Sequence, residues 1–133
     1  MKKLLSLAMV LATGAFFAQN SNLSTQNGTG NGVTVAQSGV ANASTINQDG
    51  SNSGVGNGGN NNVAAVAQMG QMNTASINQL GDSNIGAVYQ AGTLNQATQT
   101  VGAGYAENNM AMSAQSGGQN KSIQTQSYDN NFA

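Results

Sequence analysis

The sequence contains no cysteine, histidine, proline or tryptophan, and only 5% of its 133 residues are charged. Without cysteine no disulfide can form, and without cysteine and histidine the usual zinc and iron sites are excluded. Four acidic residues are too few for paired catalytic carboxylates or a dense calcium site. We therefore expect no metal, no cofactor and no enzymatic activity.

Basic residues are equally scarce, and two of the three, Lys2 and Lys3, lie at the start of the chain. The apolar run that follows, from Leu4 to Ala18, is too short to span a bilayer and is typical of a secretory signal peptide. We therefore predict a secretion signal over residues 1–18 and a short amino-terminal segment over 19–25. Only Lys121 remains as a base beyond the signal, so neither nucleic-acid binding nor membrane insertion is expected.

Aromatic residues make up only 5% of the chain, and the other apolar residues are mostly alanine and valine. A conventional globular core would therefore be thin. Abundant glycine, asparagine, glutamine and serine also fit a disordered tether, and composition alone does not separate the two possibilities.

A repeat distinguishes this chain from a disordered one. Neighbouring glutamines recur at intervals of eleven residues, with a glycine two residues later, usually an asparagine five later, and a small or apolar residue seven later. We assign residues 26–133 to a domain of about ten such half-repeats, because short internal periods indicate solenoids. Two irregularities interrupt the period: nine residues separate Gln48 from Asn57, and three extra residues follow Val101.

Within a half-repeat, segments such as NTASINQ (residues 73–79) alternate in character with a period of two, which indicates a strand. This alternation predicts that Gln79 points inward while the adjacent Asn78 points to solvent. Glycine-centred turns join the strands, since glycine can adopt the positive φ of a sharp reversal. These turn glycines are Gly39, Gly50, Gly59, Gly70, Gly81, Gly92 and Gly117.

The predicted fold is all-β: a parallel, stacked β-solenoid with cross-β spacing and about five two-strand coils of about 22 residues. Buried amides are satisfied in such a stack because each side chain can bond to its copies in neighbouring coils. The predicted ladder comprises Gln37, Asn42, Gln48, Asn62, Gln68, Asn73, Gln79, Asn84, Gln90, Asn95, Asn109, Gln115, Asn120 and Gln126. Val35, Ile46, Val66, Ile77 and Val88 are predicted to fill the core. No capping element is recognisable, so we expect copies to add end to end.

The order of these residues resembles the curlin repeat of bacterial curli subunits, and the match is cleanest over residues 37–48 and 68–79. The resemblance implies a secreted subunit of functional amyloid fibres that self-assembles at the cell surface for biofilm matrix, adhesion and aggregation. It also implies a nucleator subunit and an outer-membrane export pore as partners. Val101 departs from the pattern because it stands where a glutamine is expected.

Two other functions stay open. An ice-binding β-solenoid would need a regular outward array of threonines, for which Thr34, Thr45, Thr74 and Thr98 are the candidates. A disordered extracellular Asn/Gln-rich tether is the second alternative. The GxGxxG match at residues 54–59 does not indicate nucleotide binding, because no hydrophobic strand precedes it and no helix follows.

Overall fold

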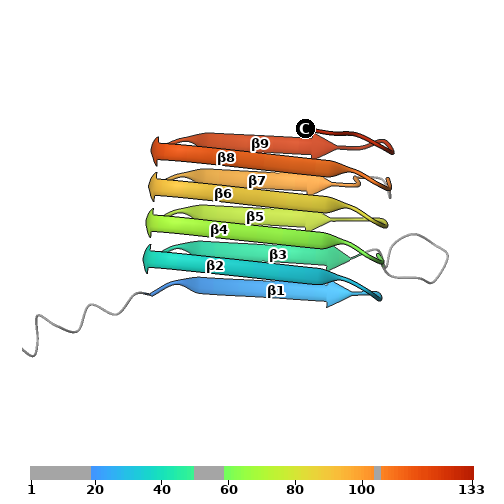
Figure 1. Cartoon of the computed structure of the whole chain (residues 1–133), viewed down its shortest axis with the longest axis horizontal. Helices are drawn as coiled ribbons and strands as arrows, with labels where there is room; N and C mark the ends of the chain where they lie inside the picture. The colour runs from blue at the N-terminus through green and yellow to red at the C-terminus, as the bar shows by residue number, and fades with distance from the viewer. Residues whose placement is uncertain (1–18, 50–58, 104–105) are drawn as a thin grey trace, which may run out of the picture.

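The computed structural model describes residues 19–49, 59–103 and 106–133. The predicted signal peptide, Gly50, Asn57 and most of the GxGxxG match lie outside these residues. The described chain forms nine strands stacked one above another (Figure 1). They are β1 (Ser21–Asn27), β2 (Gly32–Val40), β3 (Ala43–Asp49), β4 (Val63–Gln71), β5 (Thr74–Gln79), β6 (Ile85–Thr93), β7 (Gln96–Val101), β8 (Met110–Gly118) and β9 (Lys121–Gln126).

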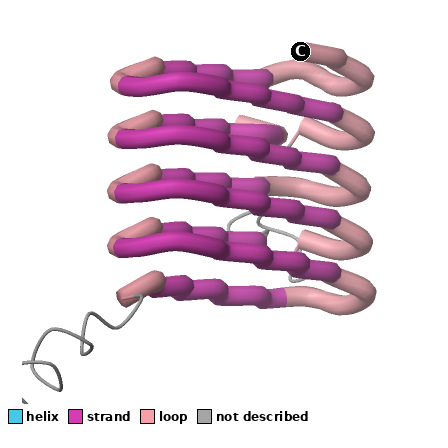
Figure 2. The backbone as a smooth tube through the Cα atoms, turned by 60° about the vertical axis from the view of Figure 1, so that its left-hand side comes forward, coloured by secondary structure: helices cyan, strands magenta, loops and turns pink. Residues whose placement is uncertain are grey.

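The strands belong to two parallel sheets that together form a β-solenoid, as the sequence predicts. The odd strands form a five-stranded sheet in the order β1-β3-β5-β7-β9, which we call sheet A. The even strands form a four-stranded sheet in the order β2-β4-β6-β8, which we call sheet B. Successive coils cross from one sheet to the other and back, as the tube in Figure 2 shows.

Equivalent positions of the repeat stack directly above one another. Ile46 pairs with Ile77 and Gln48 with Gln79 in sheet A, and Gln68 pairs with Gln90 in sheet B. Because side chains alternate between the faces of a strand, this register keeps every inward position inward. The irregular spacings fall between strands, where extra residues do not disturb that register.

One half-repeat of the predicted ten is wrong. We expected a unit to span Gln48 to Asn57, yet β1 pairs directly with β3 and β2 directly with β4. A strand from this unit has no level to occupy between those pairs, so β3 is followed by β4 as its partner in the coil. The described strands therefore make four pairs plus β9, or about four turns.

The core lies between the two sheets and consists of short side chains. Ile46, Val66, Ile77 and Val88 are each 3% exposed or less and pack with a layer of alanines. Val35, in the first coil, packs against this cluster but is only partly buried. The predicted core is thus confirmed. Small residues let the sheets approach closely: a Cβ at Gly86 would lie 2.8 Å from Cγ2 of Ile77.

The turns use two kinds of left-handed backbone. Predicted turn glycines have positive φ at positions 39, 70, 81, 92 and 117, and four of these lie near the ends of the long sheet B strands. Gly59 is buried and is not among the residues with positive φ. A second left-handed residue, never glycine, directly precedes each inward asparagine; Leu94, with φ of 59°, is one example. Among the described residues no helix is long and apolar enough to cross a membrane.

Candidate functional site

Buried glutamines form one hydrogen-bonded column in each sheet. In sheet A, Nε2 of Gln26 donates to Oε1 of Gln48 at 2.9 Å, and Nε2 of Gln48 donates to Oε1 of Gln79 at 2.8 Å. In sheet B the column runs through Gln37, Gln68, Gln90 and Gln115 with distances of 2.7, 2.8 and 2.7 Å. We call these the glutamine columns. Each donor points toward the coil that follows in the chain.

The glutamine columns also join the two sheets. Nε2 of Gln79 donates to the backbone oxygen of Val63 at 2.8 Å and to that of Asn84 at 3.0 Å, and both acceptors lie at the start of strands in sheet B or just before them. Nε2 of Gln90 donates in the same way to the backbone oxygen of Thr74 in sheet A. An amide that would be costly to bury alone is therefore satisfied on both its oxygen and its nitrogen.

Asparagines form a second set of columns at the turns. Oδ1 of Asn73 accepts the backbone N–H of Asn95 at 3.1 Å, and Nδ2 of Asn73 donates to Oδ1 of Asn42 at 3.0 Å. The same Nδ2 donates to the backbone oxygens of Met69 and Gly92, which closes the turn. Asn62, Asn84 and Asn109 form the equivalent column at the opposite turns. Asparagine side chains donate toward the preceding coil, opposite to the glutamines.

The predicted ladder residues occupy these columns, mostly with full burial. Gln79 is fully buried, whereas Asn78 is half-buried and bonds outside the core to Asn47 at 3.0 Å, which confirms the predicted alternation. Gln37, in the first coil, is partly exposed, and Asn120 is exposed. The buried members are Asn42, Gln48, Asn62, Gln68, Asn73, Gln79, Asn84, Gln90, Asn95, Asn109, Gln115 and Gln126.

Strand β7 interrupts the sheet A column, because an amide and an apolar residue have exchanged places there. Val101 stacks on Gln79 and lies below Gln126, while Gln99 stacks on Ile77. Gln99 still donates to Oε1 of Gln124 in the next strand at 2.8 Å. Within the described residues, the buried Oε1 atoms of Gln99 and Gln126 have no hydrogen-bond partner.

Val101 was recognised in the sequence as a departure, but the compensating Gln99 was not. Both lie in the strand QATQTV, whose counterpart in β5 is TASINQ. A residue-by-residue alignment of these two segments contains the signal, since glutamine and the bulky aliphatic residue change places two positions apart.

The acidic turn residues serve as hydrogen-bond acceptors between coils. Oδ1 of Asp82 accepts the backbone N–H of Asn60 at 2.6 Å, and Oδ1 of Asp129 accepts that of Glu107 at 2.8 Å. In the described part of the chain no group of three or more His, Cys, Asp or Glu residues could hold a metal ion. These carboxylates therefore belong to the turn structure.

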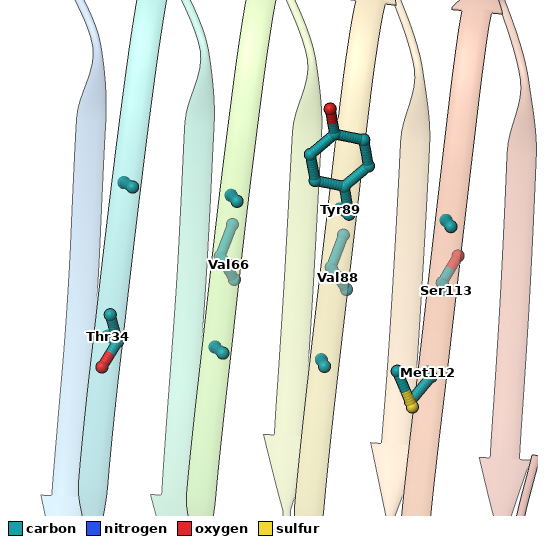
Figure 3. A pocket seen from close by; sticks show the side chains of 11 residues that line it. Thr34, Val66, Val88, Tyr89, Met112 and Ser113 are labelled. Atoms are coloured by element: carbon teal, nitrogen blue, oxygen red, sulfur yellow. The ribbon is translucent and has the colours of Figure 1, made fainter.

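The two sheets have different outer faces. Sheet A carries outward threonine, serine and asparagine, as in the stacked positions Thr45, Ser76 and Thr98. Sheet B carries mainly alanine, with exposed Tyr89 and Met112, around a shallow depression of about 310 Å³ (Figure 3).

No protein-family model, curated protein or solved structure matches this chain. The columns, the open strand edges and the contrast between the two outer faces are therefore the observations from which function is argued.

Proposed function

We propose that this chain is a secreted, non-enzymatic subunit of curli-like amyloid fibres that adds copies of itself end to end at the bacterial cell surface. The observation that carries the proposal is that hydrogen-bonded columns and strand edges are open at the solenoid's first coil. All seven residues of β1 are exposed, including Gln26, whose stacked counterparts Gln48 and Gln79 are fully buried. Open edges of this kind are templates for further strands.

The column directions support a head-to-tail arrangement. At the first coil a glutamine presents its oxygen outward along the stack, because its nitrogen already donates to the next coil. At the last described coil Gln126 Nε2 donates to the backbone of Met110, and its oxygen has no partner within the described residues. Two first coils placed together would bring acceptor against acceptor in the glutamine columns. A first coil placed on a last coil avoids this repulsion.

The outward threonines give less support to an ice-binding function. Thr45 and Thr98 stack in one column with Ser76 between them, whereas Thr74 lies in a different column of sheet A. Thr34 lies in sheet B, with Ala65 as its stacked neighbour. Thermal hysteresis in a solution of the monomer would favour the ice-binding alternative. A far-ultraviolet spectrum that stays coil-like after days would favour the disordered tether.

Fibre formation is tested with the chain that begins at Gln19. We expect conversion from soluble chain to fibres after a lag that seeds abolish, and aligned fibres should diffract at about 4.8 Å along the fibre axis. A protein that stays monomeric and does not respond to seeds at high micromolar concentration would overturn the proposal.

Two neighbouring lysine substitutions test whether the first coil is a growth surface. Gln26→Lys places a charge in the open glutamine column, where the next copy would bury it without a partner. Thr25→Lys adds the same charge one residue earlier, at the outward position that stacks on Asn47. We expect Gln26→Lys to prevent elongation of parent seeds and Thr25→Lys to permit it. Equal elongation by both would contradict growth through this coil.

By resemblance to the curlin family, the proposed partners are a nucleator subunit and an outer-membrane export pore, and the proposed activity is structural. The roles in biofilm matrix, adhesion and aggregation belong to the same proposal.

A further inference from the structure

The outer face of sheet B is a continuous apolar surface without charge. None of the residues of β2, β4, β6 and β8, all within the described chain, is Asp, Glu, Lys or Arg. The outer face of sheet A is polar and includes Asp49 and Lys121. The solenoid therefore presents two chemically different faces, although both sheets use the same inward pattern.

Large apolar side chains remain exposed on this sheet B face. Val63, Met69, Tyr89 and Met112 are 47%, 46%, 44% and 55% exposed. Soluble monomers rarely leave a contiguous apolar patch of several hundred Å² uncovered, and such patches mark interaction surfaces. A flat sheet face of this composition predicts contact with another apolar surface.

The shape of the face is complementary to itself. Ala65, Ala67, Ala87 and Ala114 line the depression, and Tyr89 stands beside it as the largest side chain of the region (Figure 3). In a twofold-symmetric interface each copy uses the same patch, so a projection next to a hollow can fill the partner's hollow while its own is filled in return. Tyrosine is also among the residues that contribute most to interface affinity.

We propose that the sheet B faces of two copies pack against each other, with Tyr89 of each copy in the alanine-lined depression of the other. This proposal rests on the proposed fibre function, because the pairing joins two fibres side by side. The small side chains at the centre allow the two sheets to approach to the usual separation of about 10 Å. The sheet A faces then point to solvent on both sides of the pair.

The available area explains why pairing should depend on fibre formation. Four strands about 4.8 Å apart and nine residues long give a face of about 19 by 30 Å, or about 570 Å² for one chain. Two faces bury about 1,100 Å², just below the roughly 1,200 Å² at which stable specific interfaces begin. Single chains should pair weakly, whereas stacked chains add their contacts along the fibre and pair firmly.

Ala87→Lys and Ser76→Lys form a matched pair of variants for this inference. Both residues point outward at the centre of a strand and are half-buried, but Ala87 lies in sheet B and Ser76 in sheet A. A lysine at 87 places like charges opposite each other in the proposed interface, while a lysine at 76 faces solvent. Neither substitution alters an inward position, so both variants should form fibres with unchanged cross-β diffraction.

The deciding measurement is mass per unit length by scanning transmission electron microscopy. With five levels of sheet A, one chain occupies about 24 Å of a fibre. We expect two chains per 24 Å for the parent and for Ser76→Lys, and one for Ala87→Lys. Tyr89→Ala should also give fibres in which the single-width fraction is increased. Parent fibres with one chain per 24 Å, or Ala87→Lys fibres with two, would overturn the pairing.

Sedimentation of the soluble chain separates this inference from the proposed function. If the parent formed no fibres, the fibre proposal would fail, yet weak self-association at millimolar concentration, lost in Ala87→Lys and kept in Ser76→Lys, would support the interface. A parent without self-association in that experiment would overturn the interface as well. Single fibres that adhere to apolar beads would also overturn it, because the face would then bind a foreign surface instead of a second copy.

Discussion

In β7 an amide and an apolar side chain stand in exchanged positions, and reversing them should repair two columns at once. The double substitution Gln99→Ile with Val101→Gln restores the order found in β5, where Ile77 and Gln79 occupy the corresponding positions. Glutamine at 101 would lie between Gln79 and Gln126, and Ile at 99 would extend the aliphatic stack. The substitution leaves the residue volume of the strand almost unchanged.

The magnitude follows from the two buried oxygens that lack a partner. Each unsatisfied buried group costs about 1–3 kcal/mol, so removing both should gain about 2–6 kcal/mol. Gln99 would lose its bonds to Gln124 and to the backbone oxygen of Ala87, each worth about 1 kcal/mol. The expected net gain in folding free energy is therefore about 1–4 kcal/mol.

The assay is guanidinium unfolding at one fixed protein concentration, with the double variant, Val101→Gln alone and the parent. We expect the midpoint to rise in the double variant, and to rise less in Val101→Gln because Gln99 Oε1 would still lack a partner. In fibres, the critical concentration should fall about tenfold for each 1.4 kcal/mol gained. An unchanged or lower midpoint in the double variant would refute the idea that the interrupted column weakens the solenoid.

Three further substitutions test other features. Gln79→Ala should cost about 1–3 kcal/mol by opening the glutamine column, whereas Gln96→Ala removes the same side chain from an exposed position and should stay within about 0.5; equal denaturation midpoints would contradict the inward column. Gly70→Ala should abolish folding or shift unfolding strongly, since its Cβ would meet a backbone oxygen at 2.0 Å with φ at +110°, while Gly118→Ala, whose nearest contact is 3.5 Å, should be tolerated; near-native stability of Gly70→Ala would show that the coils can separate there. Leu94→Asn should stabilise by up to about 1 kcal/mol because asparagine tolerates the left-handed φ of 59° better, and a lower midpoint would mean that Leu94 makes a necessary contact.

The strand positions could be predicted from the sequence because two signals coincide in each half-repeat. In NTASINQ, the period of two assigns faces, and the eleven-residue recurrence assigns the stacking partner of each residue. Gln48 above Gln26 and Ile77 above Ile46 follow from these signals alone. A parallel stack has one register that keeps all inward positions inward, so the pattern specifies the fold.

The turns could not be predicted to the same depth. The spacing around Asn57 suggested an additional half-repeat, because an insertion and a degenerate repeat look alike in a glycine- and asparagine-rich segment. The left-handed residues before the inward asparagines were also missed, since Met72 and Leu94 are not residue types that adopt positive φ readily. Their conformation is imposed by the asparagine that follows, which holds the turn from inside.

The outer faces were beyond a single-repeat reading. Each strand has outward positions of modest character, and the apolar nature of sheet B appears only when alternate half-repeats are collected onto one sheet. Ala67, Tyr89 and Ala114 are separated by 22 and 25 residues in the sequence, but they stack in one line. The grouping depends on the two-strand coil, which the chain reveals only once it is folded.

The aligned glycines at positions 39, 70 and 92 act as a filter on what can join the stack. A Cβ at any of them would lie within 2.0 Å of the carbonyl oxygen of the next glycine in line. A coil can therefore lie beneath another only if its own residue at this place has no side chain. A foreign chain with compatible strands but the wrong residue at the bend would be rejected at the fibre end, so strains with differently punctuated repeats should not seed one another even in a shared matrix.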